Sequence, residues 1–140
     1  MIFHRAVMIH GLADARAALA ECQPVTLLSA PGAGLYAGCL WWRGIADFVR
    51  RETSAPDNAI MDILDCADGS GQAMAALRAG VRNLVLWHEA PGWNAVAEIA
   101  AEQGGCLLAT APASLDMADW DTRRHLDAWL AAATGCTIRS

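Results

Sequence analysis

Short apolar runs alternate with longer segments of helical period, and this alternation repeats five times along the chain. The apolar runs are too short for helices, and turns containing Gly, Pro or Asp follow several of them, as is typical of strands. They predict strands at residues 6–9, 25–29, 59–65, 81–87 and 106–110. The segments between them predict helices at about residues 13–22, 35–51, 72–78, 93–103 and 117–133.

Strands that alternate with helices of this length require a parallel sheet, because each crossover returns the chain to the same end of the sheet. Residues 25–28 and 84–87 are continuously apolar, which is typical of strands covered on both faces. The pattern therefore predicts one α/β domain over residues 1–140, built in three layers around a five-stranded, mostly parallel sheet. Such a domain is flavodoxin-like or Rossmann-like, with helices on both faces and the strand order 2-1-3-4-5.

Composition and charge narrow the classes of partner. The chain is 55% hydrophobic and 18% charged, its formal net charge is -5, and it contains no lysine. With no basic stripe, a nucleic-acid or anionic-membrane partner is not expected. The uncharged stretch 22–42 is interrupted by Pro and Gly, so we expect no membrane span and a cytoplasmic protein. The five cysteines are scattered without a C-x-x-C pair, which disfavours a disulfide framework or zinc site and predicts small buried side chains.

Ligands of open parallel sheets bind beyond the carboxyl ends of the strands, where the strand order reverses. In the predicted order, His10 lies opposite Asp65, Cys66 and Asp68, and His88 follows the next strand. Asp65 and His88 are candidate acid/base residues. Cys66, just ahead of a helix N-terminus, is a candidate nucleophile whose alternative is a buried free thiol.

Two turns could hold an anion through backbone N–H groups at a helix start. They give the candidate cofactor-binding residues Gly32, Gly34, Gly69, Ser70 and Gly71. The first turn departs from the dinucleotide fingerprint by one residue and also suits an ordinary strand-to-helix turn, so no cofactor is identified. In the second turn, Asp68 could instead cap the helix, which is the more frequent use of Asp there.

Asp62, Asp65 and Asp68 recur every three residues but do not predict a metal site. Side chains alternate along a strand, so Asp62 and Asp65 point to opposite faces and cannot chelate one ion together. A carboxylate within a central strand is costly unless it is paired. Asp62 therefore predicts either a strand near the sheet edge or a partner such as Arg5 or Arg82.

The helix predicted at 35–51 has more apolar surface than one sheet face can cover. One stripe has the spacing needed to pack on the sheet and comprises Leu35, Cys39, Trp42, Ile45 or Ala46, and Val49. The second stripe comprises Tyr36, Leu40, Trp41, Gly44 and Phe48. We expect self-association through Leu40, Trp41 and Phe48, since aromatic anchors are typical of protein interfaces. Alternatively, Trp120 and Trp129 of the last helix, or Phe3, cover the stripe within one chain.

The sequence leaves three functions open. The first is a small-molecule or anion-binding domain that uses the carboxyl-end crevice. The second is a small enzyme with acid/base chemistry at Asp65, Asp68 and His88, or with Cys66 as nucleophile. The third is a self-associating interaction module without a ligand.

Overall fold

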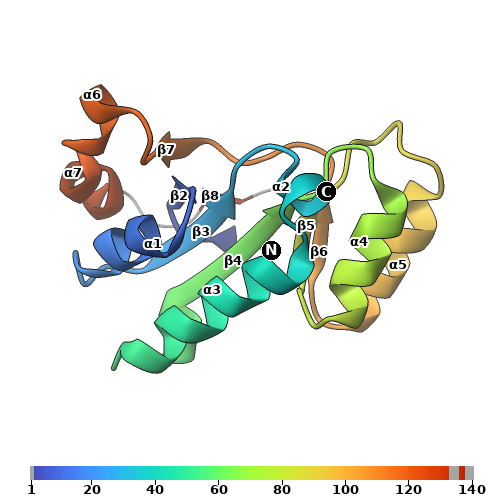
Figure 1. Ribbon diagram of the computed structural model, residues 1–140, viewed down its shortest axis with the longest axis horizontal. Helices are drawn as coiled ribbons and strands as arrows, with labels where there is room; N and C mark the ends of the chain where they lie inside the picture. Colours follow the sequence, from blue (N-terminus) through green and yellow to red (C-terminus); the bar gives the residue numbers. More distant parts are fainter. Residues whose placement is uncertain (1, 133–135, 138–140) are drawn as a thin grey trace.

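Six parallel strands form the main sheet in the order β6-β5-β4-β3-β2-β7 (Figure 1). The computed structural model describes residues 2–132 and the backbone of residues 136–137. The strands are β2 (Ala6–Ile9), β3 (Val25–Ser29), β4 (Ile60–Asp65), β5 (Asn83–Val85), β6 (Cys106–Leu108) and β7 (Ser114–Asp116). Each strand pairing in this sheet is parallel. The predicted α/β class with a mostly parallel sheet is confirmed.

The strand order differs from the predicted 2-1-3-4-5. From β2 to β6 the chain moves one strand at a time in a single direction, and β7 then pairs on the free side of β2. β7 is a sixth strand that the sequence did not predict, because its three residues are too few to show a period. The first predicted strand therefore lies inside the sheet, between β3 and β7.

The helices of the described residues lie mainly on one face of the sheet. They are α1 (Leu12–Leu19), α2 (Ala33–Tyr36), α3 (Cys39–Glu52), α4 (Ser70–Arg78), α5 (Trp93–Glu102), α6 (Trp120–Arg123) and α7 (Leu126–Ala131). Right-handed crossovers that all step in the same direction place their helices on the same face. The larger core cluster accordingly joins Val7, Leu27, Leu64 and Leu84 of the strands to buried residues of α1, α3, α4, α5 and α7.

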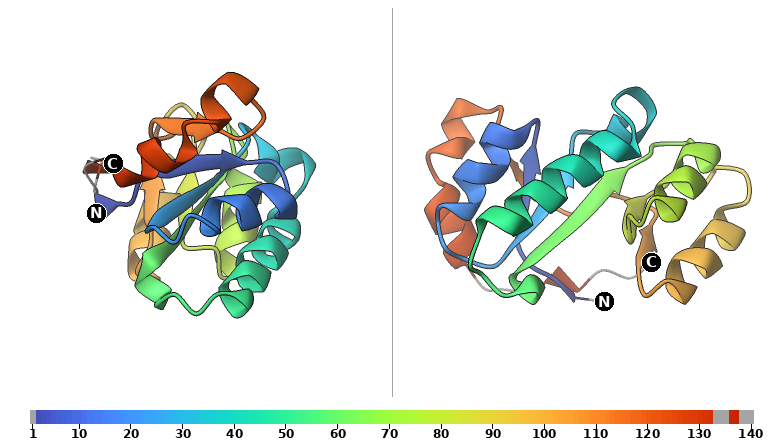
Figure 2. Two further views of the ribbon diagram at one scale, coloured as in Figure 1. Left: turned by 90° about the vertical axis from the view of Figure 1, so that its left-hand side faces the viewer. Right: turned by 60° about the horizontal axis from the view of Figure 1, so that its bottom comes forward.

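The second face is covered differently. β1 (Ile2–Phe3) pairs antiparallel with β8 (Cys136–Thr137), and β1 lies on the side of the sheet opposite α1 and α3 (Figure 2). Phe3 is fully buried in a smaller cluster with Ala6, Leu28, Ile63, Val85 and Leu108. No helical residue in the described part of the chain belongs to this cluster. The predicted helical layer on this face is therefore replaced by a short β ribbon.

Two predicted helices are divided in the structure. The segment 35–51 becomes α2 and α3, because Gly38 adopts φ 90° between them and interrupts the helical hydrogen bonds. The predicted buried stripe is confirmed for Trp42, Ile45, Ala46 and Val49. It was wrong for Leu35, which is 42% exposed because the helix is interrupted before α3, and Cys39 is half-buried. The segment 117–133 becomes α6 and α7, with Asp119 capping α6 through the N–H of Asp121. Its last predicted residue, 133, lies outside the described residues.

Asp62 lies in β4, well inside the sheet, and is paired with an arginine. Its Oδ1 accepts from Arg50 Nη2, and its Oδ2 accepts from Trp42 Nε1 at 3.1 Å. The expectation of an arginine partner is confirmed, but its identity was wrong. Arg50 belongs to α3, whose register over β4 places Trp42 and Arg50 above the same carboxylate.

The cysteines are less uniformly buried than predicted. Cys66 is buried, Cys39 and Cys106 are half-buried and Cys22 is exposed, while the side chain of Cys136 lies outside the described residues. None of the helices in the described part of the chain combines the length and the apolar character that a membrane span requires.

Candidate functional site

Asp65 ends β4 and joins the loops that follow β3 and β4. Its Oδ1 accepts hydrogen bonds from the N–H groups of Gly32 at 3.2 Å and Ala67 at 2.9 Å. Its own N–H donates to Ser29 Oγ at 2.9 Å, and the residue is only 6% exposed. Ala67 adopts φ 48°, which residues with a Cβ rarely do, so the carboxylate also steadies a strained turn. The predicted acid/base residue therefore serves to connect two loops.

Cys66 is fully buried behind α2. Burial, together with the smaller electrostatic effects of Asp65 and Cys39, raises the pKa of its thiol to about 12. The thiol is therefore protonated at neutral pH, whereas a nucleophilic cysteine must be a thiolate within reach of substrate. These surroundings disfavour the nucleophilic role predicted for Cys66.

His88 follows β5 on a loop beside the one that follows β4. The Trp87 N–H donates to Ala67 O at 2.7 Å, so the two loops are neighbours, as the sequence predicts. The imidazole of His88 is exposed and lies against Trp93, with ring centroids 5.0 Å apart. The carboxylate of Asp65 accepts the N–H of Gly32 and makes no bond to His88. The loops are adjacent, but the two side chains have different partners.

Two of the four candidate cofactor-binding glycines, Gly34 and Gly69, allow close packing, whereas a Cβ on Gly71 would meet nothing within 4 Å. A Cβ on Gly34 would lie 2.7 Å from Cys66 Sγ, and a Cβ on Gly69 would lie 2.4 Å from Leu35 Cδ2. The N–H of Gly32, which an anion would need, already donates to Asp65. α2 therefore sits directly on the carboxyl end of β4, where the crevice was predicted.

Asp68 does not cap α4, so that prediction was wrong. Gly69 occupies the N-cap position and has no side chain with which to cap the helix, which starts at Ser70; its N–H donates to Cys66 O at 2.9 Å. Asp68 falls one residue too early and is exposed. Ser70 Oγ donates to Pro91 O, which ties the start of α4 to the loop before α5.

The strand order reverses between β2 and β7, so the ligand position expected of a parallel sheet lies between their carboxyl ends. His10 and Asp116 meet there, with 2.6 Å between His10 Nε2 and Asp116 Oδ1. The prediction that His10 faces Asp65 was wrong, because β3 separates their strands. Asp116 was missed because β7 was missed, although an Asp that ends a short apolar run after Pro112 was a usable signal.

Two further side chains hold this pair in place. Asp14 Oδ2 accepts from the His10 N–H at 2.9 Å, and Asp14 Oδ1 accepts from Arg123 Nη1 at 3.3 Å. The imidazole and the Asp116 carboxylate remain 36% and 43% exposed. General-base catalysis uses an imidazole oriented by a carboxylate, so this pair is the site's best arrangement for proton transfer.

The interaction between His10 and Asp116 predicts that the pKa of Asp116 changes when His10 is replaced. Partial burial of Asp116 works against ionisation, but the Ala118 N–H and the hydrogen bond and charge of His10 together lower its pKa below 3.8. This pair should therefore stabilise the fold above about pH 4, and the contribution should be lost as the pH falls through the lowered pKa. In His10→Ala we expect the Asp116 pKa to rise, as followed by carboxyl-carbon NMR titration.

His125→Ala is the matched control for this titration, because His125 is exposed and no contact joins its side chain to Asp116. It should leave the Asp116 titration unchanged. An unchanged titration in His10→Ala would contradict the pairing.

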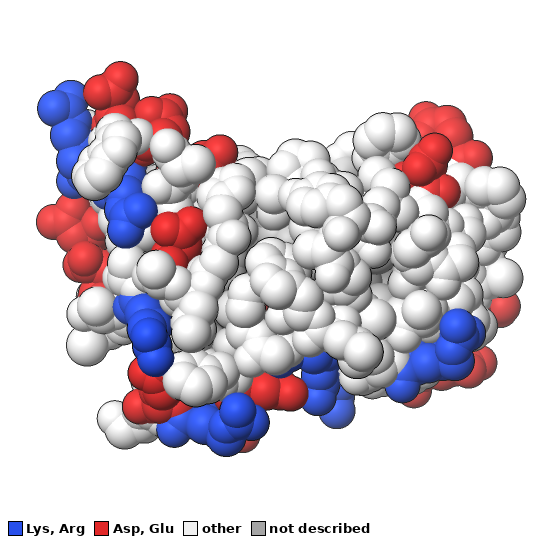
Figure 3. Space-filling model, viewed as in Figure 1, with Lys and Arg blue, Asp and Glu red and all other residues white. Residues whose placement is uncertain are grey.

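A large apolar area is exposed on α2 and along α3. We define the α2–α3 surface as Leu35, Tyr36, Leu40, Trp41 and Phe48. Tyr36 is 71% and Leu40 is 76% exposed, whereas Trp41 packs partly against the core. Figure 3 shows a band without charged side chains over α2, the start of α3 and much of α4, with charges gathered at the ends and lower border of this view.

The side chains expected as an alternative cover for this surface lie elsewhere in the chain. Trp129 Nε1 donates to Ala6 O at 2.8 Å, and the Trp129 ring lies under the Arg5 guanidinium. Phe3 is buried on the second sheet face, and Trp120 is itself 79% exposed. None of these three covers the α2–α3 surface in the described part of the chain, so the alternative of an intrachain cover is wrong.

The comparisons with known proteins add no assignment. No protein-family model, curated protein or solved structure matches the chain. Among the described residues, no three His, Cys, Asp or Glu side chains gather as a metal site would require.

Proposed function

We propose that the chain is an α/β interaction domain that forms a homodimer through the α2–α3 surface. The observation that carries the proposal is the exposure of Tyr36 on α2 and Leu40 at the start of α3. Figure 3 shows no charged side chains over α2 and the start of α3. The predicted cytoplasmic location belongs to this proposal. So does the expectation that nucleic acid and membranes are not partners, which is based on the net charge of -5.

The energetics favour covering this surface. Burying a large apolar side chain fully contributes roughly 1.5–3 kcal/mol relative to leaving it in water. Tyr36 and Leu40 leave most of that contribution unused in a single chain. In a two-fold symmetric dimer the same patch meets itself, and an uncharged patch does so without bringing like charges together. A second copy of this chain is therefore a suitable occupant.

The structure of the carboxyl end favours this function over the two crevice functions. Asp65 is bonded to two loop N–H groups, Cys66 is buried, and Gly34 is in close contact with Cys66. These residues pack α2 onto the sheet, and α2 in turn presents Tyr36. Four of the predicted catalytic and anion-binding residues, Asp65, Cys66, Gly32 and Gly34, thus support the interaction surface.

The test is the mass of the protein in solution. By light scattering at micromolar concentration we expect a dimer for the wild-type chain and a monomer for Leu40→Asp, because a charge at the centre of an apolar interface is left without a partner. Leu40 is largely exposed, so this substitution should leave the melting temperature of the monomer nearly unchanged.

Trp120→Asp is the matched control. Trp120 is as exposed as Leu40 but lies on α6, outside the α2–α3 surface. It should leave the dimer intact. A monomeric wild-type chain, or equal dissociation by Trp120→Asp and Leu40→Asp, would contradict the proposal.

A further inference from the structure

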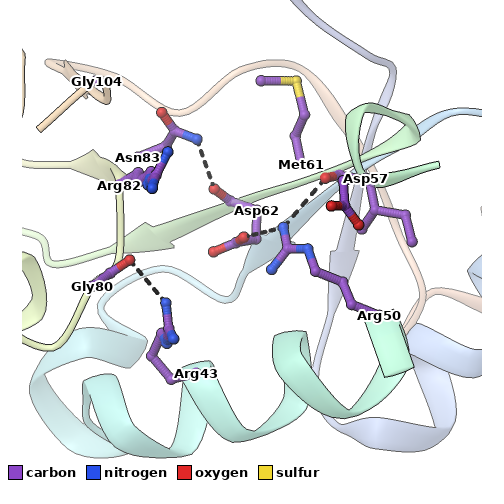
Figure 4. Close-up of a pocket in the computed structure, with 10 residues that line it drawn as sticks. Arg43, Arg50, Asp57, Met61, Asp62, Gly80, Arg82, Asn83 and Gly104 are labelled. Atoms are coloured by element: carbon purple, nitrogen blue, oxygen red, sulfur yellow. Dashed lines mark hydrogen bonds and ion pairs between the residues drawn. The ribbon is translucent and has the colours of Figure 1, made fainter. Parts of the chain in front are cut away.

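A polar cavity of about 400 Å³ opens at the amino ends of the strands, at the end of the sheet opposite the predicted crevice. Residues at the start of β4, the turns before β5 and β6, and α3 line it (Figure 4). The lining includes Arg43, Arg50, Arg82, Asp57, Asp62 and Asn83. Its volume suits a ligand of metabolite size.

Three of the chain's ten arginines line this cavity. Arg43 Nη1 donates to Gly80 O at 2.9 Å, and its Nη2 lies 3.2 Å from Asp47. Arg50 Nη2 donates to Asp62 and to Ile60 O. Figure 4 shows both side chains extending from α3 toward the strand ends. Two of the three guanidinium groups are therefore already held in position.

The held guanidinium groups keep unused donors. Each guanidinium carries five N–H donors, and the bonds of Arg43 and Arg50 engage only their Nη atoms. Arg82 is exposed beside Asn83, and its side chain makes no ion pair or hydrogen bond with the described residues. An arginine without a structural partner at the mouth of a cavity is available to a ligand.

Two carboxylates in the lining limit what the ligand can be. Asp62 is engaged by Arg50 and Trp42, whereas Asp57 is exposed. The arginines favour a group with several negatively charged oxygens, and tetrahedral phosphate oxygens can accept from guanidinium groups that approach from different directions. The carboxylates can accept hydrogen bonds from hydroxyl groups.

We propose that this cavity binds a small phosphorylated polyol, with its phosphate on Arg43 and Arg82 and its hydroxyl groups toward Asp57. This site is independent of the α2–α3 surface. Arg50, already paired with Asp62, forms the fixed wall between the phosphate and hydroxyl positions.

Calorimetric titration of the full chain tests the site with three probes at one ionic strength: glucose 6-phosphate, inorganic phosphate and citrate. Glucose 6-phosphate should bind most tightly, because it alone offers both a phosphate and hydroxyl groups. Arg82→Ala should weaken it by about tenfold or more, the loss expected for a charge-assisted contact. Arg78→Ala, an exposed arginine of α4 outside the cavity lining, is the matched control and should change binding less than twofold.

Since the Arg82 side chain makes no hydrogen bond or ion pair with the described residues, and alanine keeps the backbone carbonyl that accepts the Cys106 N–H, its substitution should not unfold the protein. Arg43→Ala provides a second test of the phosphate position and should also weaken binding. The proposal is overturned if no probe binds at millimolar concentration, if citrate binds more tightly than glucose 6-phosphate, or if Arg82→Ala and Arg43→Ala bind like the wild type.

Discussion

Gly105→Ala is expected to lower the free energy of unfolding by about 3 kcal/mol or more, among the largest effects of a single methyl group in this chain. A Cβ on Gly105 would lie 1.8 Å from the carbonyl oxygen of Arg82 and 2.6 Å from its carbonyl carbon. Both atoms belong to backbone, which cannot move aside as a flexible side chain can. Chemical denaturation at a fixed protein concentration would measure the loss.

The physical reason is the position of this contact between two strands. Arg82 O accepts the Cys106 N–H at 3.0 Å, and the Gly105 N–H donates to Ala100 O at 2.9 Å. Making room for a methyl group must separate β6 from β5 or pull the end of α5 away from the strand. Either movement breaks backbone hydrogen bonds that are expensive to leave unmade.

Gly71→Ala is the control for this prediction. Gly71 lies in α4, and a Cβ there would meet nothing within 4 Å. Alanine should stabilise the helix by up to about 1 kcal/mol, because glycine loses more conformational freedom on folding. A Gly105→Ala protein as stable as the wild type would contradict the close approach of β6 to β5.

Five strands of the main sheet could be predicted because their segments are short and mostly apolar. Every residue of Val25–Ser29 is buried, so local composition alone identifies β3. The strand order could not be predicted, because no local pattern states on which side of the first strand the next one pairs. Phe3 closes the second face, and a single aromatic residue in a two-residue strand carries no periodic signal.

The candidate site was harder to predict than the fold. The rule that ligands bind at carboxyl ends correctly brought the loops of Asp65 and His88 together. It could not show that α2 would fill the space beside Asp65, because that depends on the absence of a Cβ at Gly34. His10 and Asp116 are 106 residues apart, so their pairing follows only from the order of β2 and β7.

The exposed stripe could be predicted because it depends on helical spacing, which is a local pattern in the sequence. Helical spacing assigns Trp42 and Val49 to one side of α3, and Leu40 then has to lie on another. The structure confirms both placements. Which partner covers the stripe depends on surfaces beyond this helix, so dimerisation stays a prediction.

Asp62→Ala is the second substitution with a large expected effect, about 2–4 kcal/mol of lost stability. It removes the acceptor of both Arg50 Nη2 and Trp42 Nε1. The side chains of Arg50 and Asp62 are only 28% and 14% exposed, and Trp42 is fully buried. The indole N–H would be left without an acceptor, and the arginine would keep a charge that water reaches poorly. Asp62→Asn should cost less, because its amide oxygen can still accept one of the two bonds.

The exposed ion pair between Arg16 and Glu52 provides the comparison. Its side chains are 53% and 42% exposed, so Glu52→Ala should cost less than about 1 kcal/mol. All variants must be compared at one protein concentration, because dimerisation would add to the measured stability. In a double-mutant cycle, Arg50→Ala should lose much of its effect once Asp62 is alanine, since the arginine then has no carboxylate to neutralise it. Fully additive losses, or an Asp62→Ala variant no less stable than Glu52→Ala, would show that the carboxylate in β4 is not held by Arg50 and Trp42.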